Sequence, residues 1–231
     1  MKSTRPHRSW TLKICRRAAS ITLALAVVLA PAISATQSAQ AQTYTVLYEL
    51  GGKHGIFPAA GLIEDEKGNF YSTTENGGTS NGCVDGCGTV FKLDKTGKET
   101  VQYSFTGGAD GAIPIAGLIR DEAGNLYGTT DGGGASGNGT VFKLDANGKE
   151  TVLHSFAGGA DGADPHAGLI RDAAGNLYSV TVGGGTSNRG TVFKLDTNGQ
   201  ETVLYTFTGG ADGGFPEDRL IRDAAPVTYM V

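Results

Sequence analysis

Short apolar runs alternate with turn signals along most of the chain. In its middle, "GLIRD", "NLYGTT", "GTVFKLD" and "KETVLHSF" follow one another, and D-x-x-G sequences separate the first run from the second and the third from the fourth. The runs are rich in Val, Leu, Phe, Tyr and Thr, and no helix-length periodic segment is present. Glycine in each D-x-x-G supplies the positive φ that closes a tight hairpin. The pattern therefore predicts four short strands joined in pairs.

These four runs recur along the chain. "GLI" stands at Gly61, Gly117 and Gly168, and "RLI" stands at Arg219, so the spacings are 56, 51 and 51 residues. The first spacing is longer because extra residues surround "CVDGC". Four strands in about 50 residues, repeated in tandem, are typical of a β-propeller blade, whereas a solenoid repeats every 20 to 30 residues or so. We therefore expect an all-β, propeller-like fold with a period of 51.

The repeat also sets the expected boundaries. Three repeats and a partial fourth are predicted near residues 61–116, 117–167, 168–218 and 219–231. Complete blades are expected at 61–105, 117–156 and 168–207. "YTVLYEL", residues 44–50, matches "ETVLYTF" and is expected to be an orphan last strand, while residues 219–224 are an orphan first strand. Pairing of the two orphans would close a ring of four blades, the lower limit for a propeller.

One stretch makes a resemblance specific. "GNLYGTTDGGGASGNGTVFKLDANGKETVLHSFAGGADGADPHAGLIRD" resembles the GloVer repeat, a tandem repeat of secreted bacterial "choice-of-anchor" proteins. The resemblance covers essentially all of the chain after its leader and rests on the combination of LYGTT, GTVFKL and DGxxP. It implies secretion and a blade-like β repeat. It implies no activity for any residue of this chain, which departs from the family pattern by ending before an anchor.

The first 41 residues read as a secretory signal. "MKSTRPHRSWTLKICRR" is basic and contains no acid, an apolar run follows, and "AQA" at Ala39–Ala41 fits the small-residue cleavage rule. We expect cleavage near Ala41, a mature chain over 42–231, and a secreted, periplasmic or cell-surface location without a membrane span after the signal is removed.

Removing this signal makes the chain strongly acidic. The whole chain has 19 basic and 23 acidic residues, and the mature part keeps 13 basic residues and all the acids, a formal net charge of −10. Such a charge argues against nucleic acid or anionic lipid as a partner. The expected partner is an unknown extracellular ligand or surface polymer, with self-association through open blade edges as a further expectation.

Three recurring aspartates are the weak binding candidates. Asp110, Asp161 and Asp212 occupy one position of the "GGADG" loops, on the face opposite the D-x-x-G hairpins. A polar or metal site ringed by them is one interpretation. An Asx turn in each repeat is the favoured one, because every blade needs a turn and only one needs a site. His54 stands in the same position of the preceding loop, which breaks a metal ring, so neither a metal nor a cofactor is predicted.

Cys83 and Cys87 are the only cysteines after the signal. A C-x₃-C pair in an oxidising compartment predicts a disulfide that closes a short loop. A zinc site needs two more ligands, and only Asp85 is nearby.

No catalytic constellation emerges from the sequence. His54, His154 and His166 occupy different positions of the repeat, and no Ser or Cys nucleophile keeps a fixed relation to them. We expect a non-catalytic binding, adhesion or structural module in which no single residue is catalytic. The alternative is an extracellular propeller enzyme of lyase or glycosidase type acting on polysaccharide.

The last residues break the repeat. After "RDAA" the expected "GNLYG" is replaced by "PVTYMV". The bases CCGGTAACCTATATGGTA encode Pro-Val-Thr-Tyr-Met-Val, and from the third base they encode Gly-Asn-Leu-Tyr-Gly. The hypothesis is a truncated array whose further blades and anchor lie in a shifted frame, which sequencing of the downstream gene would test.

Overall fold

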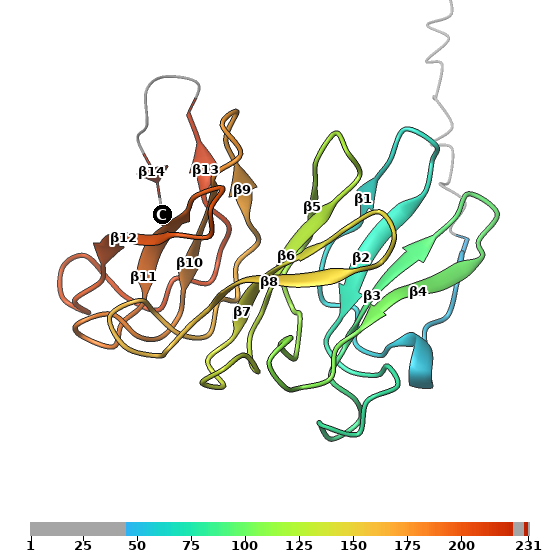
Figure 1. Cartoon of the computed structure of the whole chain (residues 1–231), viewed down its shortest axis with the longest axis horizontal. Helices are drawn as coiled ribbons and strands as arrows, with labels where there is room; N and C mark the ends of the chain where they lie inside the picture. Colours follow the sequence, from blue (N-terminus) through green and yellow to red (C-terminus); the bar gives the residue numbers. More distant parts are fainter. Residues whose placement is uncertain (1–44, 224–228, 231) are drawn as a thin grey trace, which may run out of the picture. The chain divides into compact units, whose positions relative to one another are not determined.

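The structure is a computed structural model that describes residues 45–223 and 229–230 (Figure 1). Residues 45–231 form one compact unit, in which three four-stranded antiparallel sheets follow one another. Blade 1 contains β1 (Ile63–Glu64), β2 (Phe70–Thr74), β3 (Thr89–Leu93) and β4 (Glu99–Ser104). Blade 2 contains β5 (Ile119–Arg120), β6 (Leu126–Thr130), β7 (Thr140–Leu144) and β8 (Glu150–Ser155).

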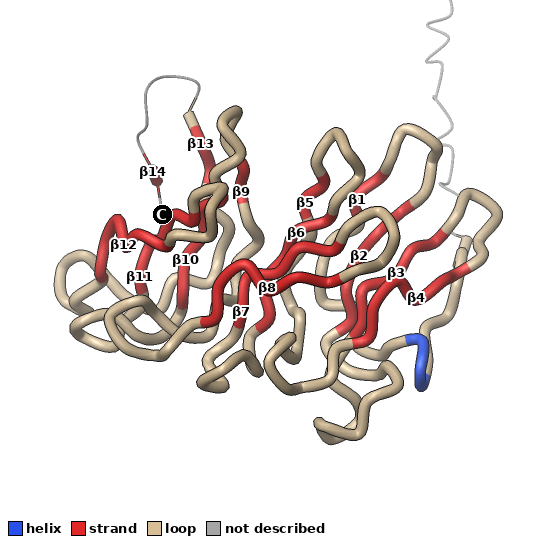
Figure 2. The backbone as a smooth tube through the Cα atoms, viewed as in Figure 1, coloured by secondary structure: helices blue, strands red, loops and turns tan. Residues whose placement is uncertain are grey.

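Blade 3 contains β9 (Ile170–Arg171), β10 (Leu177–Thr181), β11 (Thr191–Leu195) and β12 (Glu201–Thr206). In every blade the strands lie in chain order, and a two-stranded sheet of β13 (Ile221–Arg222) and β14 (Tyr229–Met230) follows. The only helix among the described residues is the 3₁₀ turn η1 (Gly52–His54), as Figure 2 shows. The prediction of an all-β, propeller-like repeat of four-stranded blades is confirmed.

The D-x-x-G sequences form the expected hairpin turns. In blade 1 the Asp65 Oδ1 accepts hydrogen bonds from the backbone N–H groups of Lys67 and Asn69, each at 2.9 Å. Gly68 closes the turn at a φ of 77°. The hydroxyl of Tyr71, on the next strand, donates to Asp65 Oδ2 at 3.0 Å, and the same Tyr–Asp bond recurs in blades 2 and 3. The aspartate therefore fixes both the turn and the strand that leaves it.

The third strands are buried on both faces. "TVFKL" has the same burial pattern in β3, β7 and β11, with only the lysine partly exposed. Phenylalanines stack across the junctions between neighbouring blades: the ring centres of Phe105 and Phe142 lie 5.1 Å apart edge to face, and so do those of Phe156 and Phe193. The core is thus a series of inter-blade layers, which explains why these strands do not alternate apolar with polar residues.

The segments that connect successive blades, here called linkers, dock on the blade that precedes them. The buried hydroxyl of Thr73 in β2 donates to the carbonyl of Ala116 at 3.1 Å, and Thr129 in β6 does the same to Ala167 at 3.3 Å. The backbone N–H of Ile113 donates to the carbonyl of Cys87 at 2.9 Å. Each linker therefore holds the next blade in a fixed position against the last one.

One prediction about the terminal segments is wrong. Residues 45–50 form no strand, and β13 pairs with β14 instead of with that segment. A strand needs a hydrogen-bonded neighbour, and in the described part of the chain residues 45–50 have none in a strand. The predicted signal, residues 1–41, and most of the altered C-terminus lie outside the described residues.

The fourth repeat also pairs in a different register. In blade 3 Ile170 is opposite Tyr178, whereas Ile221, which occupies the same repeat position, is opposite Met230 rather than Tyr229. The turn of blade 3 depends on Gly175 at a φ of 91°. Pro226 stands at the position of this glycine in the sequence and lies outside the described residues.

Candidate functional site

The structure shows what Asp110, Asp161 and Asp212 contact. Asp110 Oδ2 accepts hydrogen bonds from the Tyr103 hydroxyl at 2.9 Å and from the backbone N–H of Thr106 at 2.8 Å. Asp212 repeats this arrangement, and the hydrogen bonds from Thr208 hold its pKa at about 2. Asp161 accepts from the backbone N–H of Ala157 at 2.7 Å. Each aspartate thus accepts from the backbone N–H four residues before it and closes the loop at the start of its linker. This differs from an Asx turn, in which the side chain accepts from the N–H two residues further on.

Among the described residues, His54 and His154 lie outside the pocket that is described below, and both have partners. His54 Nδ1 lies 2.7 Å from Glu99 Oε2, and Glu99 is buried. His154 takes the position of Tyr103 and Tyr205, packs edge to face on Phe156 at 4.7 Å and lies 3.7 Å from Asp161. Burial lowers the pKa of His154, and Asp161 opposes this shift. Both histidines stand at positions where the other repeats also have a polar side chain: Asp110, Asp161 and Asp212 for His54, and Tyr103 and Tyr205 for His154.

Carboxyl groups face each other at the two complete junctions. Glu150 and Glu201 occupy the repeat position of Glu99, but Asp110 and Asp161 stand in front of them where His54 faces Glu99. Burial and then the neighbouring aspartate raise the pKa of each glutamate to about 7. Oε1 of both glutamates accepts no hydrogen bond in the described part of the chain.

The protein should therefore be more stable at pH 5.5 than at pH 7.5. Glu150 and Glu201 keep a proton in the folded state up to about pH 7, whereas an unfolded glutamate loses it near 4.5. The folded state binds more protons in this window, so stability falls as pH rises through it. Urea midpoints at the two pH values measure the effect.

The double variant Glu150→Gln and Glu201→Gln is the control, because glutamine cannot titrate. It should remove most of the pH dependence and raise the urea midpoint at pH 7.5. His154, whose lowered pKa gives the opposite slope below about pH 6.5, is the same in both proteins and cancels in the comparison. An unchanged slope in the variant would contradict the assignment.

Cys83 and Cys87 are joined by the predicted disulfide, with an S–S distance of 2.10 Å. The bond lies in the β2–β3 loop of blade 1, and the backbone N–H of Ile113 in the following linker donates to the carbonyl of Cys87.

In the non-reduced protein, mass spectrometry should show the peptide that spans both cysteines lighter by the two hydrogens lost on oxidation. Because the closed loop is short, the double Cys→Ser variant should lose about 2 kcal/mol or less. Two free thiols or stoichiometric zinc would contradict the prediction.

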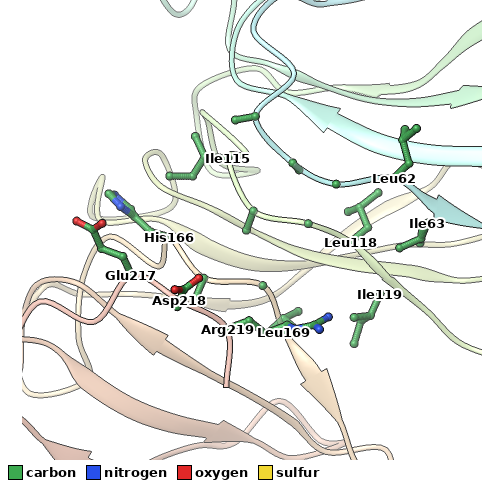
Figure 3. A pocket seen from close by; sticks show the side chains of 17 residues that line it. Leu62, Ile63, Ile115, Leu118, Ile119, His166, Leu169, Glu217, Asp218 and Arg219 are labelled. Carbon is green, nitrogen blue, oxygen red and sulfur yellow. The ribbon is translucent and has the colours of Figure 1, made fainter. Parts of the chain in front are cut away.

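The main candidate site is a pocket where the segments that lead into the first strand of each repeat meet. The recurring phrases at Gly61–Ile63, Gly117–Ile119 and Gly168–Leu169 line it together with Arg219, so we call it the axial pocket (Figure 3). Its volume is about 360 Å³. This lies within the range of sites that bind small molecules.

One residue of each linker contributes to the rim of the axial pocket. The position two residues before each "GLI" or "RLI" holds Ala59, Ile115, His166 and Glu217 in turn. Two are apolar and two are polar, and Figure 3 shows His166 and Glu217 at the same end of the pocket. The rim is therefore apolar on one side and polar on the other, although the scaffold beneath it is repetitive.

Behind His166 the polar side continues. Nε2 of His166 lies 2.7 Å from Asp131 Oδ1, and all three groups of this cluster (His166, Asp131 and Asp164) are partly buried. Asp131 Oδ1 accepts no hydrogen bond of regular geometry among the described residues in spite of this ion pair. Burial and then the charge of Asp131 raise the pKa of Asp164, and His166 opposes the shift. Such a cluster can accept or donate protons and hydrogen bonds at the rim.

Sequence reasoning singled out His166 but missed Asp131 and Asp164. The signal was available in the repeat: the other blades have Val182 or Glu75 at the position of Asp131, and Ile113, Phe57 or Phe215 at that of Asp164. Three positions that vary between the repeats thus meet in space. Within the described ranges, no group of three or more His, Cys, Asp or Glu side chains is arranged to hold a metal ion. No helix in the described part is long and apolar enough to span a membrane.

Solved structures with a similar arrangement belong to varied proteins. A gluconolactonase from Xanthomonas campestris has a TM-score of 0.45 and 18% identity, with 71% of this chain and 50% of that chain covered. A luciferin-regenerating enzyme has a TM-score of 0.44 and 18% identity, and the match covers 69% of this chain and 47% of that chain. Dipeptidyl peptidase 4 from Porphyromonas gingivalis has a TM-score of 0.40 and 16% identity, and the match covers 65% of this chain and 18% of that chain. The chain spans half or less of these structures, and the similarity says nothing about its activity.

No curated protein is significantly similar to the chain. The model of one protein family does match it, under the description Gloeobacter/Verrucomicrobia repeat, over residues 33–230. This range includes every described strand, and the resemblance first seen in LYGTT, GTVFKL and DGxxP is confirmed. The chain therefore belongs to the Gloeobacter/Verrucomicrobia repeat family.

Proposed function

We propose that this protein is a secreted, non-catalytic binding module that takes its ligand at the polar side of the axial pocket. The disulfide and the bacterial repeat family indicate an extracellular location. The proposal adds that the signal is cleaved near Ala41, so that the working protein begins at residue 42. The ligand is an extracellular small molecule or the end of a surface polymer.

One observation carries the proposal: three positions that vary between the repeats meet at the polar side of the pocket. Positions that recur in every blade serve turns, hairpins and packing, since each blade needs these. His166 lines a pocket of ligand size, and Asp131 and Asp164 lie beside His166. Binding residues are commonly carried on loops that a rigid scaffold positions, and the linkers are such loops.

Residues from the other repeats can be substituted at these three positions to test the proposed binding site. His166→Ile, Asp164→Ile and Asp131→Val each install the residue that another blade has at that position. Wild type is first screened on an array of glycans and surface polymers. The variants should then lose about tenfold or more of the affinity for the ligand found, with an unchanged melting temperature. His154→Tyr, which installs the residue of Tyr103 away from the rim, is the control and should bind like wild type.

An extracellular enzyme acting on polysaccharide is the second candidate. The 2.7 Å pair of His166 and Asp131 favours it, because a carboxylate commonly orients a histidine that acts as a general base. A hydrolase and lyase screen separates the two functions. Turnover that His166→Ile abolishes in a folded protein would overturn the non-catalytic proposal. Ligand binding without turnover that is insensitive to all three rim variants would overturn both.

A further inference from the structure

A leucine and a proline recur at the junctions between consecutive repeats. The leucine of the "GLI" or "RLI" phrase packs against the preceding blade in the later repeats: Leu118, Leu169 and Leu220 are exposed by 3%, 0% and 1%. The proline of each linker lies close to a loop glycine of that preceding blade, as Pro114 lies over Gly88 and Pro165 over Gly139. A covered leucine and a docked linker therefore show that a repeat packs against a preceding blade.

The side of blade 1 that would face a preceding blade lacks this cover. Leu62, in the same position as the three buried leucines, is 54% exposed, and Phe57 of its linker is 64% exposed. We call this surface, with residues 45–50, the leading face. On it Lys53 and Lys98 border a hollow of about 420 Å³ beside Glu99.

Residues 45–50 already lie where the outer strand of a preceding blade would lie. A Cβ placed on Gly97 would be 3.1 Å from the carbonyl oxygen of Leu47. In the same way, a Cβ placed on Gly148 would be 3.3 Å from the carbonyl oxygen of Gln102 in β4, and a Cβ placed on Gly199 would be 3.1 Å from that of Leu153 in β8. Leu47, Gln102 and Leu153 share one repeat position. On the leading face, residues 45–50 thus occupy the position of the outer strand of a preceding blade, while the other strands of such a blade are missing from the described part of the chain.

The opposite side of blade 3 is also open. Tyr205 is 46% exposed, Phe215 of the last linker 48%, and Ile221 of β13 58%. We call these residues, with β13 and β14, the trailing face. Its linker carries the acidic Asp212, Glu217 and Asp218, of which the last two are exposed, opposite in charge to Lys53 and Lys98 of the leading face.

We propose that the protein self-associates head to tail, with the leading face of one copy on the trailing face of a second copy. Each face is one half of the junction that recurs inside the chain, and a second copy is the occupant whose chemistry matches both. Residues 45–50 of one copy, which hold the position of an outer strand, would then complete the blade that β13 and β14 of the second copy begin. Because the two faces differ, the contact is heterologous and builds either a closed ring or a longer array. The proposal does not rest on ligand binding at the axial pocket, although Glu217 and Asp218 also line that pocket.

The test uses the protein over residues 42–231 and two matched variants. Phe57→Asp alters the leading face and Phe215→Asp the trailing face, at the same repeat position. The chain tolerates aspartate there, since Asp164 occupies that position at a φ of 55°. Sedimentation equilibrium of wild type should show concentration-dependent association. Each variant should raise the concentration for half association about tenfold or more.

Mixing the two variants is the decisive measurement. The Phe57→Asp protein keeps its trailing face and the Phe215→Asp protein keeps its leading face, so the mixture should form dimers and nothing larger. The double variant should be monomeric, and Val84→Asp, on the exposed disulfide loop, should associate like wild type. If loss of the Arg189–Phe215 contact disturbs folding, Ile221→Asp is used in place of Phe215→Asp. Wild type that is monomeric throughout its soluble range, variants that associate like wild type, or a mixture that stays monomeric would each overturn the proposal.

Discussion

Replacing Phe142 by alanine should lower the free energy of unfolding by about 3–5 kcal/mol. The ring is fully buried and stacks on Phe105 of the preceding blade, so the substitution removes apolar area and opens a cavity in the junction between blades 1 and 2. The loss is a large part of the roughly 5–15 kcal/mol that stabilises an ordinary domain. Urea unfolding of the purified protein, followed by circular dichroism, measures it.

Val84→Ala is the control for this substitution. Val84 is also apolar, but it is exposed on the disulfide loop, so its truncation should change the unfolding free energy by about 0.5 kcal/mol or less. A loss under about 1 kcal/mol for Phe142→Ala would mean that the junction between blades 1 and 2 does not support the fold.

Replacing Gly162 by alanine should cost about 2–5 kcal/mol. Gly162 has a φ of 107°, which side chains rarely adopt, and a Cβ there would lie 2.5 Å from Thr181 Oγ1 and 2.6 Å from its Cγ2. Thr181 is fully buried and bonded to Thr191 at 2.9 Å, so it cannot move aside without breaking that bond. Differential scanning calorimetry should show a clearly lower melting temperature.

The chain contains a matched control for this variant. Gly213 stands at the same repeat position with a φ of 75°, but nothing lies within 4 Å of a Cβ built on it. Gly213→Ala should therefore show only the backbone cost, about 1–2 kcal/mol. Equal losses in the two variants would rule out the threonine contact as the reason for glycine at this position.

The sequence predicted the blades well because local chemistry determines them. Asp65 and Gly68 fix a hairpin within a few residues, and the apolar runs on each side identify the strands, so the four-stranded unit could be read from one repeat. The terminal segments depend on long-range pairing, which no local pattern specifies. Residues 45–50 match a strand sequence but pair with no strand in the described part of the chain, and β13 pairs with β14 instead.

The candidate site was less predictable for the same reason. His166 is visible in the sequence as an isolated histidine, but its partner Asp131 lies in the β6–β7 loop of blade 2, 35 residues earlier. Asp164 is hidden in a sequence, "GADP", that looks like an ordinary turn. Only the docking of the linker on the preceding blade brings these residues together. Comparing the repeats with one another would have identified all three.

The linkers contain one backbone feature whose consequence concerns how such proteins diversify. Phe57, Ile113, Asp164 and Phe215 all adopt a positive φ, between 55° and 60°, and each precedes a proline. Ile113 and Asp164 use both their backbone N–H and C=O groups in hydrogen bonds, so the main chain alone fixes the position. The side chain is left free to be aromatic, aliphatic or acidic. After a duplication, a single codon change there gives a linker new chemistry, two residues before the one that lines the axial pocket, without altering the scaffold. An array of such repeats can therefore evolve several specificities from one fold.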